Sequence, residues 1–495
     1  NEEDAKGNPD GLIRSVNWKM SGTSQTQTLY YDGGSSLTNA TGTQSFSLNS
    51  IAIQTATNNS VVKDRDYTVS VDGSLNAESL LYTPGDHTVT FTGIGGFRSS
   101  YSIYFHVVVT RSGLLWSDAD ANGTSIEIPW REDGYRLGTG KLSLYKKIGD
   151  VATTTTLNSD DVVSVTKDGS TVPGATYNQE FKDIGSYTVK IQGPKPATGS
   201  TTLTISILYD LRSVTVDMGP GATDNPFTGN DVYSSGLAQI KVYRTSTKTD
   251  ENKLKYNTDY GISRQYADGR TSSNNFADAG TINVTLTPVS GHSKYFGDGD
   301  EPVHPYTITP LDQDTNYTLD DKNPEQITDA IFQKTYNGTD QKPEDKEFDG
   351  KVKYKGTPLV LNKDFTVAYS PSSTVNAGKY TVVIHGIGNY TGVRSFAGAY
   401  EIQKFDLSTI AAGKVTVPDQ YYNGKAITPQ SIKVDGVTGD LAFGTDYTVD
   451  NATNNVNPGT KTAKVDIKGA GINFTGKVSE VPFSIKKLDL GTYTP

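Results

Sequence analysis

The sequence contains no cysteine and only 2 methionines among its 495 residues. The absence of cysteine excludes disulfide bonds, thiolate nucleophiles and cysteine-ligated zinc or iron–sulfur centres. Glycine and tyrosine are instead frequent, with 50 and 29 copies. This balance is typical of a surface protein that avoids oxidisable side chains.

Long apolar runs are also absent, since no stretch approaches the ~20 residues that a helix needs to span a bilayer. We therefore expect no direct membrane insertion by this segment. No signal peptide is visible either, and residues 1–4 look like a mature or trimmed start. The net charge is −10 and the acidic residues are spread along the chain, which argues against nucleic acid as a partner.

The residue patterns of common catalytic sites are missing. None of the histidines stands in a His-Glu-x-x-His motif, and no Gly-x-Ser-x-Gly motif accompanies them. The sequence therefore predicts a protein that is not an enzyme. The five histidines are His87, His106, His292, His304 and His385.

No window shows the sustained 3.6-residue period of an amphipathic helix, whereas short β-branched segments are common. Residues 186–191, 380–384 and 463–467 are examples, and Gly, Asn, Asp and Pro clusters bound them. One short helical turn is expected within 323–331. Many short, evenly spaced strands predict an all-β fold of two-sheet sandwiches.

The chain repeats one series of short motifs about 83 residues apart. A repeat of this length corresponds to one small domain, so the sequence predicts a string of similar modules. The clearest pairs are Tyr-Asn-Gly at 336–338 and 422–424, Asp-Phe-Thr-Val at 364–367 with Asp-Tyr-Thr-Val at 446–449, Asn-Ala-Gly at 376–378 with Asn-Pro-Gly at 457–459, and Gly-Ile-Gly-Asn-Tyr-Thr-Gly at 386–392 with Gly-Ala-Gly-Ile-Asn-Phe-Thr-Gly at 469–476.

Looser copies of these motifs continue toward the N-terminus, with Asn-Thr-Asp-Tyr at 257–260 and Asp-Tyr-Thr-Val at 66–69. The second copy is the weakest and keeps Asp-Ile-Gly-Ser-Tyr-Thr-Val at 183–189. We therefore expect five modules, with the last residues beginning a truncated sixth, because 485–492 echoes 402–409. The expected ranges are 1–110, 111–208, 209–311, 312–405 and 406–488, followed by 489–495.

These motifs resemble the bacterial Ig-like repeats of long Gram-positive cell-wall proteins. Residues 332–487 match that pattern closely, 209–311 loosely and 1–208 only in parts. The resemblance implies tandem immunoglobulin-like β-sandwiches on the outside of a cell, at its surface or in its wall. It also implies that the Tyr-Asn-Gly segments and the segments starting at Gly386 and Gly469 determine the fold and do not bind a ligand.

The segment 118–127 carries the sharpest candidate metal site. Asp118, Asp120 and Asn122 alternate along the loop, Gly123 permits a turn, and Glu127 adds a further oxygen ligand. Calcium binds such oxygen ligands in loops of this kind. The pattern departs from the helix–loop–helix motif, since Pro129 stands at position 12, where that motif has a bidentate Glu. The alternative is an acidic turn stabilised by its own Asx side chains.

A second segment, with Asp312, Asp314 and Asn316, shows the same alternation without a glycine at the sixth position. Both segments follow the closing strand of an expected module. Calcium at these module junctions would stiffen the array.

The three tryptophans, Trp18, Trp116 and Trp130, lie in the two most divergent modules. Trp116 and Trp130 are candidates for a ligand-binding face, and the alternative is packing in sandwich cores. Together these features predict a non-enzymatic adhesin or stalk that binds a host or matrix protein or a glycan. The alternatives are a surface-layer subunit that self-associates in a lattice, and an array of carbohydrate-binding modules.

Overall fold

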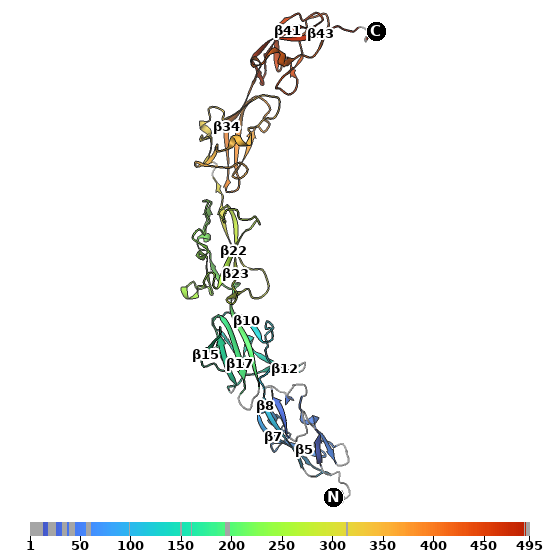
Figure 1. Ribbon diagram of the computed structural model, residues 1–495, viewed down its shortest axis with the longest axis vertical. Helices are drawn as coiled ribbons and strands as arrows, with labels where there is room; N and C mark the ends of the chain where they lie inside the picture. The colour runs from blue at the N-terminus through green and yellow to red at the C-terminus, as the bar shows by residue number, and fades with distance from the viewer. Residues whose placement is uncertain are drawn as a thin grey trace. The chain divides into compact units, whose positions relative to one another are not determined.

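The computed structural model describes residues 13–17, 26–31, 37–38, 45–55, 61–98, 100–148, 151–159, 161–193, 199–312, 315–489 and 491. Within these ranges the regular structure consists of β-strands and short 3-10 turns, with no α-helix (Figure 1). The expected all-β fold is thereby confirmed. No helix in the described part of the chain is long and apolar enough to cross a bilayer.

The chain divides into two compact units, each described by itself. The first comprises Asn1–Gly219, Leu237–Arg264 and Val284–His304, and the second comprises Pro220–Gly236, Gln265–Asn283 and Pro305–Pro495. The boundary between the units therefore passes through 209–311, the range of the third expected module.

Two expected modules lie wholly in the first unit. The strands of the first are β1 (Ile13–Asn17), β2 (Thr26–Tyr31), β3 (Leu37–Thr38), β4 (Ala52–Thr55), β5 (Tyr67–Val71), β6 (Ser74–Leu75), β7 (Gly85–Gly93) and β8 (Ser100–Val109). Those of the second are β9 (Leu114–Trp116), β10 (Ser125–Pro129), β11 (Tyr135–Arg136), β12 (Leu144–Ile148), β13 (Val151–Thr155), β14 (Val162–Lys167), β15 (Ser170–Val172), β16 (Glu180–Phe181), β17 (Gly185–Gln192) and β18 (Ser200–Asp210).

The remaining strands fall in the ranges of the third, fourth and fifth expected modules. The third module has β19 (Thr215–Asp217), β20 (Asn225–Pro226), β21 (Lys241–Tyr243), β22 (Tyr260–Tyr266), β23 (Gly280–Pro288), β24 (Ser293–Lys294) and β25 (Val303–Thr309). The fourth has β26 (Leu311–Asp312), β27 (Tyr317–Leu319), β28 (Phe332–Thr335), β29 (Val352–Tyr354), β30 (Thr357–Pro358), β31 (Phe365–Ser370), β32 (Gly378–Gly386), β33 (Tyr390–Thr391) and β34 (Val393–Gln403). The fifth has β35 (Phe405–Asp406), β36 (Val415–Thr416), β37 (Gln420–Tyr421), β38 (Ser431–Val434), β39 (Leu441–Ala442), β40 (Tyr447–Thr453), β41 (Gly459–Gly469), β42 (Phe474–Thr475) and β43 (Lys477–Lys486).

One strand order recurs in each of the five ranges. An opening strand runs parallel to the closing strand, and the closing strand lies beside the long strand that precedes it. A smaller sheet, such as β27-β29-β30 or β36-β38-β39, completes the sandwich. The chain is thus a tandem array of immunoglobulin-like β-sandwiches. The recurring paths are β2-β8-β7-β5, β10-β18-β17-β14, β20-β25-β23-β22, β28-β34-β32-β31 and β37-β43-β41-β40.

In the described part of the chain, a cluster of buried apolar side chains lies inside each expected module. Alternating strand residues supply them, because successive side chains of a strand point to opposite faces. These separate cores support our proposal of five modules with the boundaries given above. The clusters lie within 29–107, 114–207, 211–286, 317–402 and 407–485.

The Asp-Tyr-Thr-Val motif at 446–449 lies at the end of a turn and the start of strand β40. In β40 Tyr447 is fully buried, Thr448 is exposed and Val449 is half-buried. The preceding Asp446 carboxylate accepts the main-chain N–H of Ala442 at 2.9 Å and closes the turn. The same bond from an N–H four residues earlier recurs at Asp66, Asp259 and Asp364, at 2.8, 2.7 and 2.9 Å.

The Asn-Ala-Gly motif at 376–378 leads into a strand whose tyrosine lies inside the sandwich. Tyr380 is buried on β32, and its hydroxyl donates to the carbonyl of Asn376 at 2.6 Å. Tyr187 makes the same bond to the carbonyl of Asp183 at 3.0 Å in the second module. The tyrosine therefore fixes the turn that precedes its own strand.

The expected helical turn is a 3-10 segment at Pro324–Gln326, where Asn323 and Gln326 form a capping box. The other described 3-10 turns are Leu48–Ser50, Glu78–Tyr82, Gly140–Leu142, Gly219–Ala222, Leu237–Gln239, Asp250–Asn252, Asp345–Phe348, Leu407–Thr409 and Ala412–Lys414.

Asp466 gives the fifth sandwich a measurable response to acid. Its carboxylate lies on β41 and accepts bonds from Lys477 Nζ at 2.8 Å, Asn451 Nδ2 at 2.8 Å and the main-chain N–H of Glu480 at 2.9 Å. The bond from Lys477, helped by the other two, holds the pKa of Asp466 well below its ordinary value. A carboxyl whose folded-state pKa is depressed stabilises the fold above the unfolded-state pKa of about 3.9.

We expect this contribution of Asp466 to the free energy of unfolding to be complete above about pH 5 and to be lost progressively below about pH 4. Thermal unfolding of the full chain between pH 2 and pH 7 measures it, with Asp466→Asn as the control. The variant should lose less stability on acidification than the parent. Parallel curves for the two chains would show that Asp466 is not the responsible group.

Candidate functional site

The first predicted cation loop folds as an Asx turn followed by a tight hairpin turn. The Asp118 side chain accepts the main-chain N–H of Asp120 at 2.9 Å. Asn122 and Ser125 then exchange main-chain bonds of 2.7 and 3.1 Å, and Gly123 between them has a φ of 60°. The glycine is therefore needed for the hairpin, because a left-handed φ favours a residue without a Cβ.

The carboxylates of this loop face lysines. Lys141 Nζ lies 3.1 Å from Asp120 and 3.5 Å from Asp118, and its bond to Asp120 raises the pKa of Lys141. Glu127 pairs with Lys294. Within the described residues no group of three or more His, Asp or Glu side chains is placed to hold a metal ion. Asp118, Asp120 and Glu127 are thus paired with lysines here, and calcium at 118–127 stays a prediction.

The same residues line a hollow of about 890 Å³ in the first unit. Asp120, Asn122 and Glu127 contribute to it together with Lys141 and Lys294. The acidic loop thus lines a mixed-charge surface on which Asp120 pairs with Lys141 and Glu127 pairs with Lys294.

The second predicted loop is only partly described. Asp312 ends the short strand β26, where it pairs with Thr391 of β33. Asp314 lies outside the described residues. The main-chain carbonyl of Asn316 accepts the N–H of Lys355 at 3.2 Å. Calcium at this loop likewise stays a prediction.

The two described tryptophans have different surroundings. Trp116 is 2% exposed in the second core, and its Nε1 donates to the carbonyls of Thr124 and Thr204 at 3.2 and 3.1 Å. Its ring is therefore covered and does not offer a face to a ligand. Trp130 is half-buried. The guanidinium of Arg244 lies 4.9 Å from its ring centroid, and Tyr209 packs at 6.3 Å.

Trp130 occupies the position that Tyr336 and Tyr422 hold in the later modules. Its main-chain N–H donates to Leu208 of the closing strand, as those of the two tyrosines do to Gln403 and Lys486. The Trp130 ring contacts Arg244 and Tyr209 of the third expected module. Trp18 lies outside the described residues.

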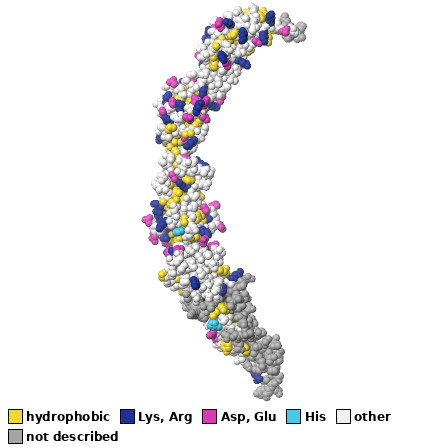
Figure 2. Space-filling view, in the orientation of Figure 1, with side chains coloured by type: hydrophobic (Ala, Val, Ile, Leu, Met, Phe, Trp, Pro, Cys, Tyr) yellow, Lys and Arg dark blue, Asp and Glu magenta, His cyan; other side chains and the backbone are white. Residues whose placement is uncertain are grey.

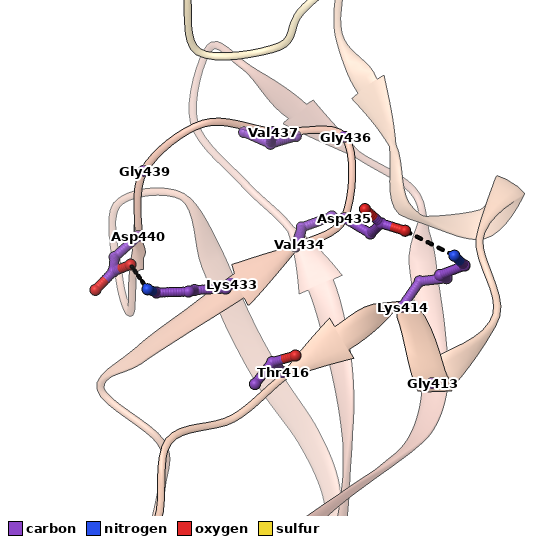
Figure 3. A pocket seen from close by; sticks show the side chains of 10 residues that line it. All are labelled: Gly413, Lys414, Thr416, Lys433, Val434, Asp435, Gly436, Val437, Gly439 and Asp440. Carbon is purple, nitrogen blue, oxygen red and sulfur yellow. Dashed lines mark hydrogen bonds and ion pairs between the residues drawn. The ribbon is translucent and has the colours of Figure 1, made fainter.

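A shallow hollow of about 470 Å³ lies on the fifth module (Figure 3). Lys414 pairs with Asp435 at 2.7 Å across one side, and Lys433 pairs with Asp440 at 3.7 Å across the other. The bond from Lys414 lowers the pKa of Asp435. The charges lining this hollow are thus paired with one another, and its lining includes no nucleophile with an adjacent base.

Three of the described histidines contact carboxylates. His87 has Asp72 at 2.7 Å from Nδ1 and the carbonyl of Thr83 at 2.7 Å from Nε2, so both ring nitrogens are engaged. His106 and His292 contact Asp86 and Asp259 at 2.5 and 3.1 Å. These pairs are consistent with structural hydrogen bonds in sheets and loops.

The repeated motifs meet one another where the fourth module joins the fifth, inside the second unit. Asn473 Oδ1 accepts the main-chain N–H of Ala377 at 2.8 Å, and its Nδ2 donates to Asn376 Oδ1 at 3.1 Å. The rings of Tyr336 and Phe474 pack edge to face at 5.2 Å. The residues that the resemblance assigned to folding alone therefore also join two modules.

The same set of contacts joins the third module to the fourth. Asn389 Oδ1 accepts the N–H of Ala279 at 2.6 Å, and its Nδ2 donates to Asp278 at 2.9 Å. Phe227 packs edge to face on Tyr390 at 5.9 Å. The sequence signal for this was an asparagine followed by an aromatic residue in a glycine-rich loop, repeated in both modules.

No family model matches the chain, and no curated protein matches it. Solved structures give weak similarities. The protocadherin GammaB4 extracellular domain shows 12% identity and a TM-score of 0.15, over 94% of this chain and 84% of that one. Sidekick-1 immunoglobulin domains 1–5 show 9% identity and a TM-score of 0.17, over 96% and 99%. The N-terminal eight Ig domains of Down Syndrome Cell Adhesion Molecule show 10% and 0.18, over 94% and 59%. TM-scores of this size establish neither a common architecture nor a common function.

Proposed function

We propose that this chain is a non-enzymatic array of Ig-like modules on the outside of a bacterial cell, acting in adhesion or as a stalk. The main support is that the repeated motif residues contact the neighbouring module. Asn389 and Asn473 each accept a main-chain N–H of the preceding module. The rings of Tyr336 and Phe474 pack on each other across a junction. Recurring contacts between successive modules are what we expect of a protein that acts as an array.

The surface of the described residues is suited to weak contacts with other molecules in solution. Lysine, arginine and acidic side chains lie interspersed on the face of the described residues that Figure 2 shows. Many exposed charges are locally paired, as in Lys351 with Asp320 and Lys353 with Asp321. Such a surface supports weak contacts repeated along an array, and repetition raises the effective concentration for binding.

The partner we propose is a host or matrix protein or a glycan that the array contacts at several modules. Two alternatives from the sequence remain outcomes of the test: self-association in a surface-layer lattice, and capture of a polysaccharide by carbohydrate-binding modules. Calcium could act at 118–127 only if it displaced Lys141 from Asp118 and Asp120.

The test is a binding screen of the full chain against immobilised matrix proteins and polysaccharides, with size-exclusion chromatography and light scattering in calcium and in chelator. We expect a monomer in both buffers that binds a surface ligand more tightly when the chain is displayed at high density. Growth into large assemblies in calcium would overturn the adhesin proposal in favour of a lattice. Binding only to polysaccharides, with quenched tryptophan fluorescence, would favour the carbohydrate-binding array.

A further inference from the structure

The two junctions in the second unit have the same donor and acceptor pattern. Each begins with a turn whose second residue offers a main-chain N–H and whose first residue offers a side-chain oxygen: Ala377 with Asn376, and Ala279 with Asp278. A single asparagine of the next module satisfies both groups. A primary amide is suited to this, because it carries one acceptor and two donors on one rigid plane.

An aromatic residue follows the asparagine in each docking loop, which we define as residues 386–392 of the fourth module and 469–476 of the fifth. Phe474 packs against Tyr336, which opens the Tyr-Asn-Gly motif of the preceding module, and Tyr390 packs against Phe227 of its preceding module. Main-chain bonds add to this. Leu311 donates to the carbonyl of Asn389, and Phe405 donates to the carbonyl of Asn473, at 2.9 and 2.8 Å. The backbone of each docking loop is thereby fixed while its asparagine side chain reaches the preceding module.

We propose that the turn Asn-Ala-Gly or Asp-Ala-Gly is a docking surface for the asparagine–aromatic loop of the following module, and that this pairing joins only modules with matching residues. This recognition between modules does not depend on the ligand of the array. Its support is the recurrence of one set of contacts, at different residues, in two places of the same chain.

Other copies of the turn and the loop lack one half of the match. Pro84 and Pro458 stand where Ala279 and Ala377 donate, and proline has no main-chain N–H. In the third module His292 stands at the asparagine position, and its main-chain carbonyl accepts from Tyr209 at 2.8 Å as the asparagine carbonyls do. The His292 side chain instead contacts Asp259 of its own module at 3.1 Å. The complete pairing is thus present where the third, fourth and fifth modules meet.

Two variants of the full chain serve as controls for each other. In Asn473→Ala the N–H of Ala377 loses its acceptor, while Ala279 keeps Asn389. In Asn389→Ala the reverse holds. Hydrogen exchange followed by mass spectrometry, with single-residue resolution at Ala279 and Ala377, reports each N–H directly. We expect exchange to accelerate at least about tenfold at the affected alanine and to change little at the other.

A third variant checks that the side chain acts through this bond. Ala377→Pro removes the donor but leaves the bond from Asn473 Nδ2 to Asn376, so adding Asn473→Ala to it should accelerate exchange in the fifth-module loop less than Asn473→Ala does in the parent. Unchanged exchange at Ala377 in Asn473→Ala would overturn the proposal. Equal acceleration at both alanines in either variant would also overturn it, since that result means general destabilisation. Thermal unfolding of each variant, run in parallel, identifies that case.

Discussion

Replacement of Asp161 with alanine is expected to lower the free energy of unfolding of the second module by about 3–5 kcal/mol. Asp161 and Arg111 form a buried ion pair with bonds of 2.7 and 2.9 Å, and their side chains are 0% and 3% exposed. Asp161 also accepts the main-chain N–H of Asn158 at 2.7 Å. The variant leaves the guanidinium of Arg111 buried without its counter-charge, which is the costly part.

Calorimetric unfolding of the full chain measures this, because the transition of one module shifts against those of the others. The control is the double variant Arg111→Met/Asp161→Leu, which replaces the pair with apolar groups and should recover much of the lost stability. An Asp161→Ala chain whose transitions all coincide with those of the parent would contradict the buried-pair account.

Trp116→Ala is expected to cost a similar amount, about 3–5 kcal/mol, because it opens a large cavity in the second core. The indole also satisfies the carbonyls of Thr124 and Thr204 through its N–H. Calorimetry of the full chain again gives the measurement. The result distinguishes a core residue from the sugar-binding residue that the sequence alternative describes.

Trp130→Ala is the matched control, since Trp130 is half-buried and contacts Arg244 and Tyr209. Trp130→Ala should lower the free energy of unfolding of the second module less than Trp116→Ala does. If Trp116→Ala unfolded at the parent's temperature but no longer bound a glycan that the parent binds, Trp116 would be a ligand residue after all.

Much of the fold could be predicted because its determinants are local in the sequence. The Asp-Tyr-Thr-Val turn closes through a bond between Asp446 and Ala442, four residues apart. Tyr380 fixes the turn at Asn376 over the same distance. Such short-range bonds leave a pattern of polar and aromatic residues at fixed spacing, and the repetition of that pattern reveals the modules.

The functional contacts were harder to predict because they join distant residues. Asn473 contacts Ala377, which lies 96 residues earlier, and nothing near either residue indicates the other. The cation loops show the same difficulty, since Lys141 faces Asp120 from 21 residues away. Spacing alone gave the carboxylates of 118–127 but not the lysines that neutralise them.

Small-angle X-ray scattering after size-exclusion chromatography tests most directly the claim that the repeated motif residues join successive modules. Three full chains are compared: the parent, Tyr336→Ala/Asn473→Ala, and Tyr422→Ala. Tyr422 occupies the same motif position as Tyr336 but is 38% exposed. We predict a broader distance distribution for the double variant alone, in calcium and in chelator alike. A double variant whose scattering superimposes on that of the parent would contradict the claim.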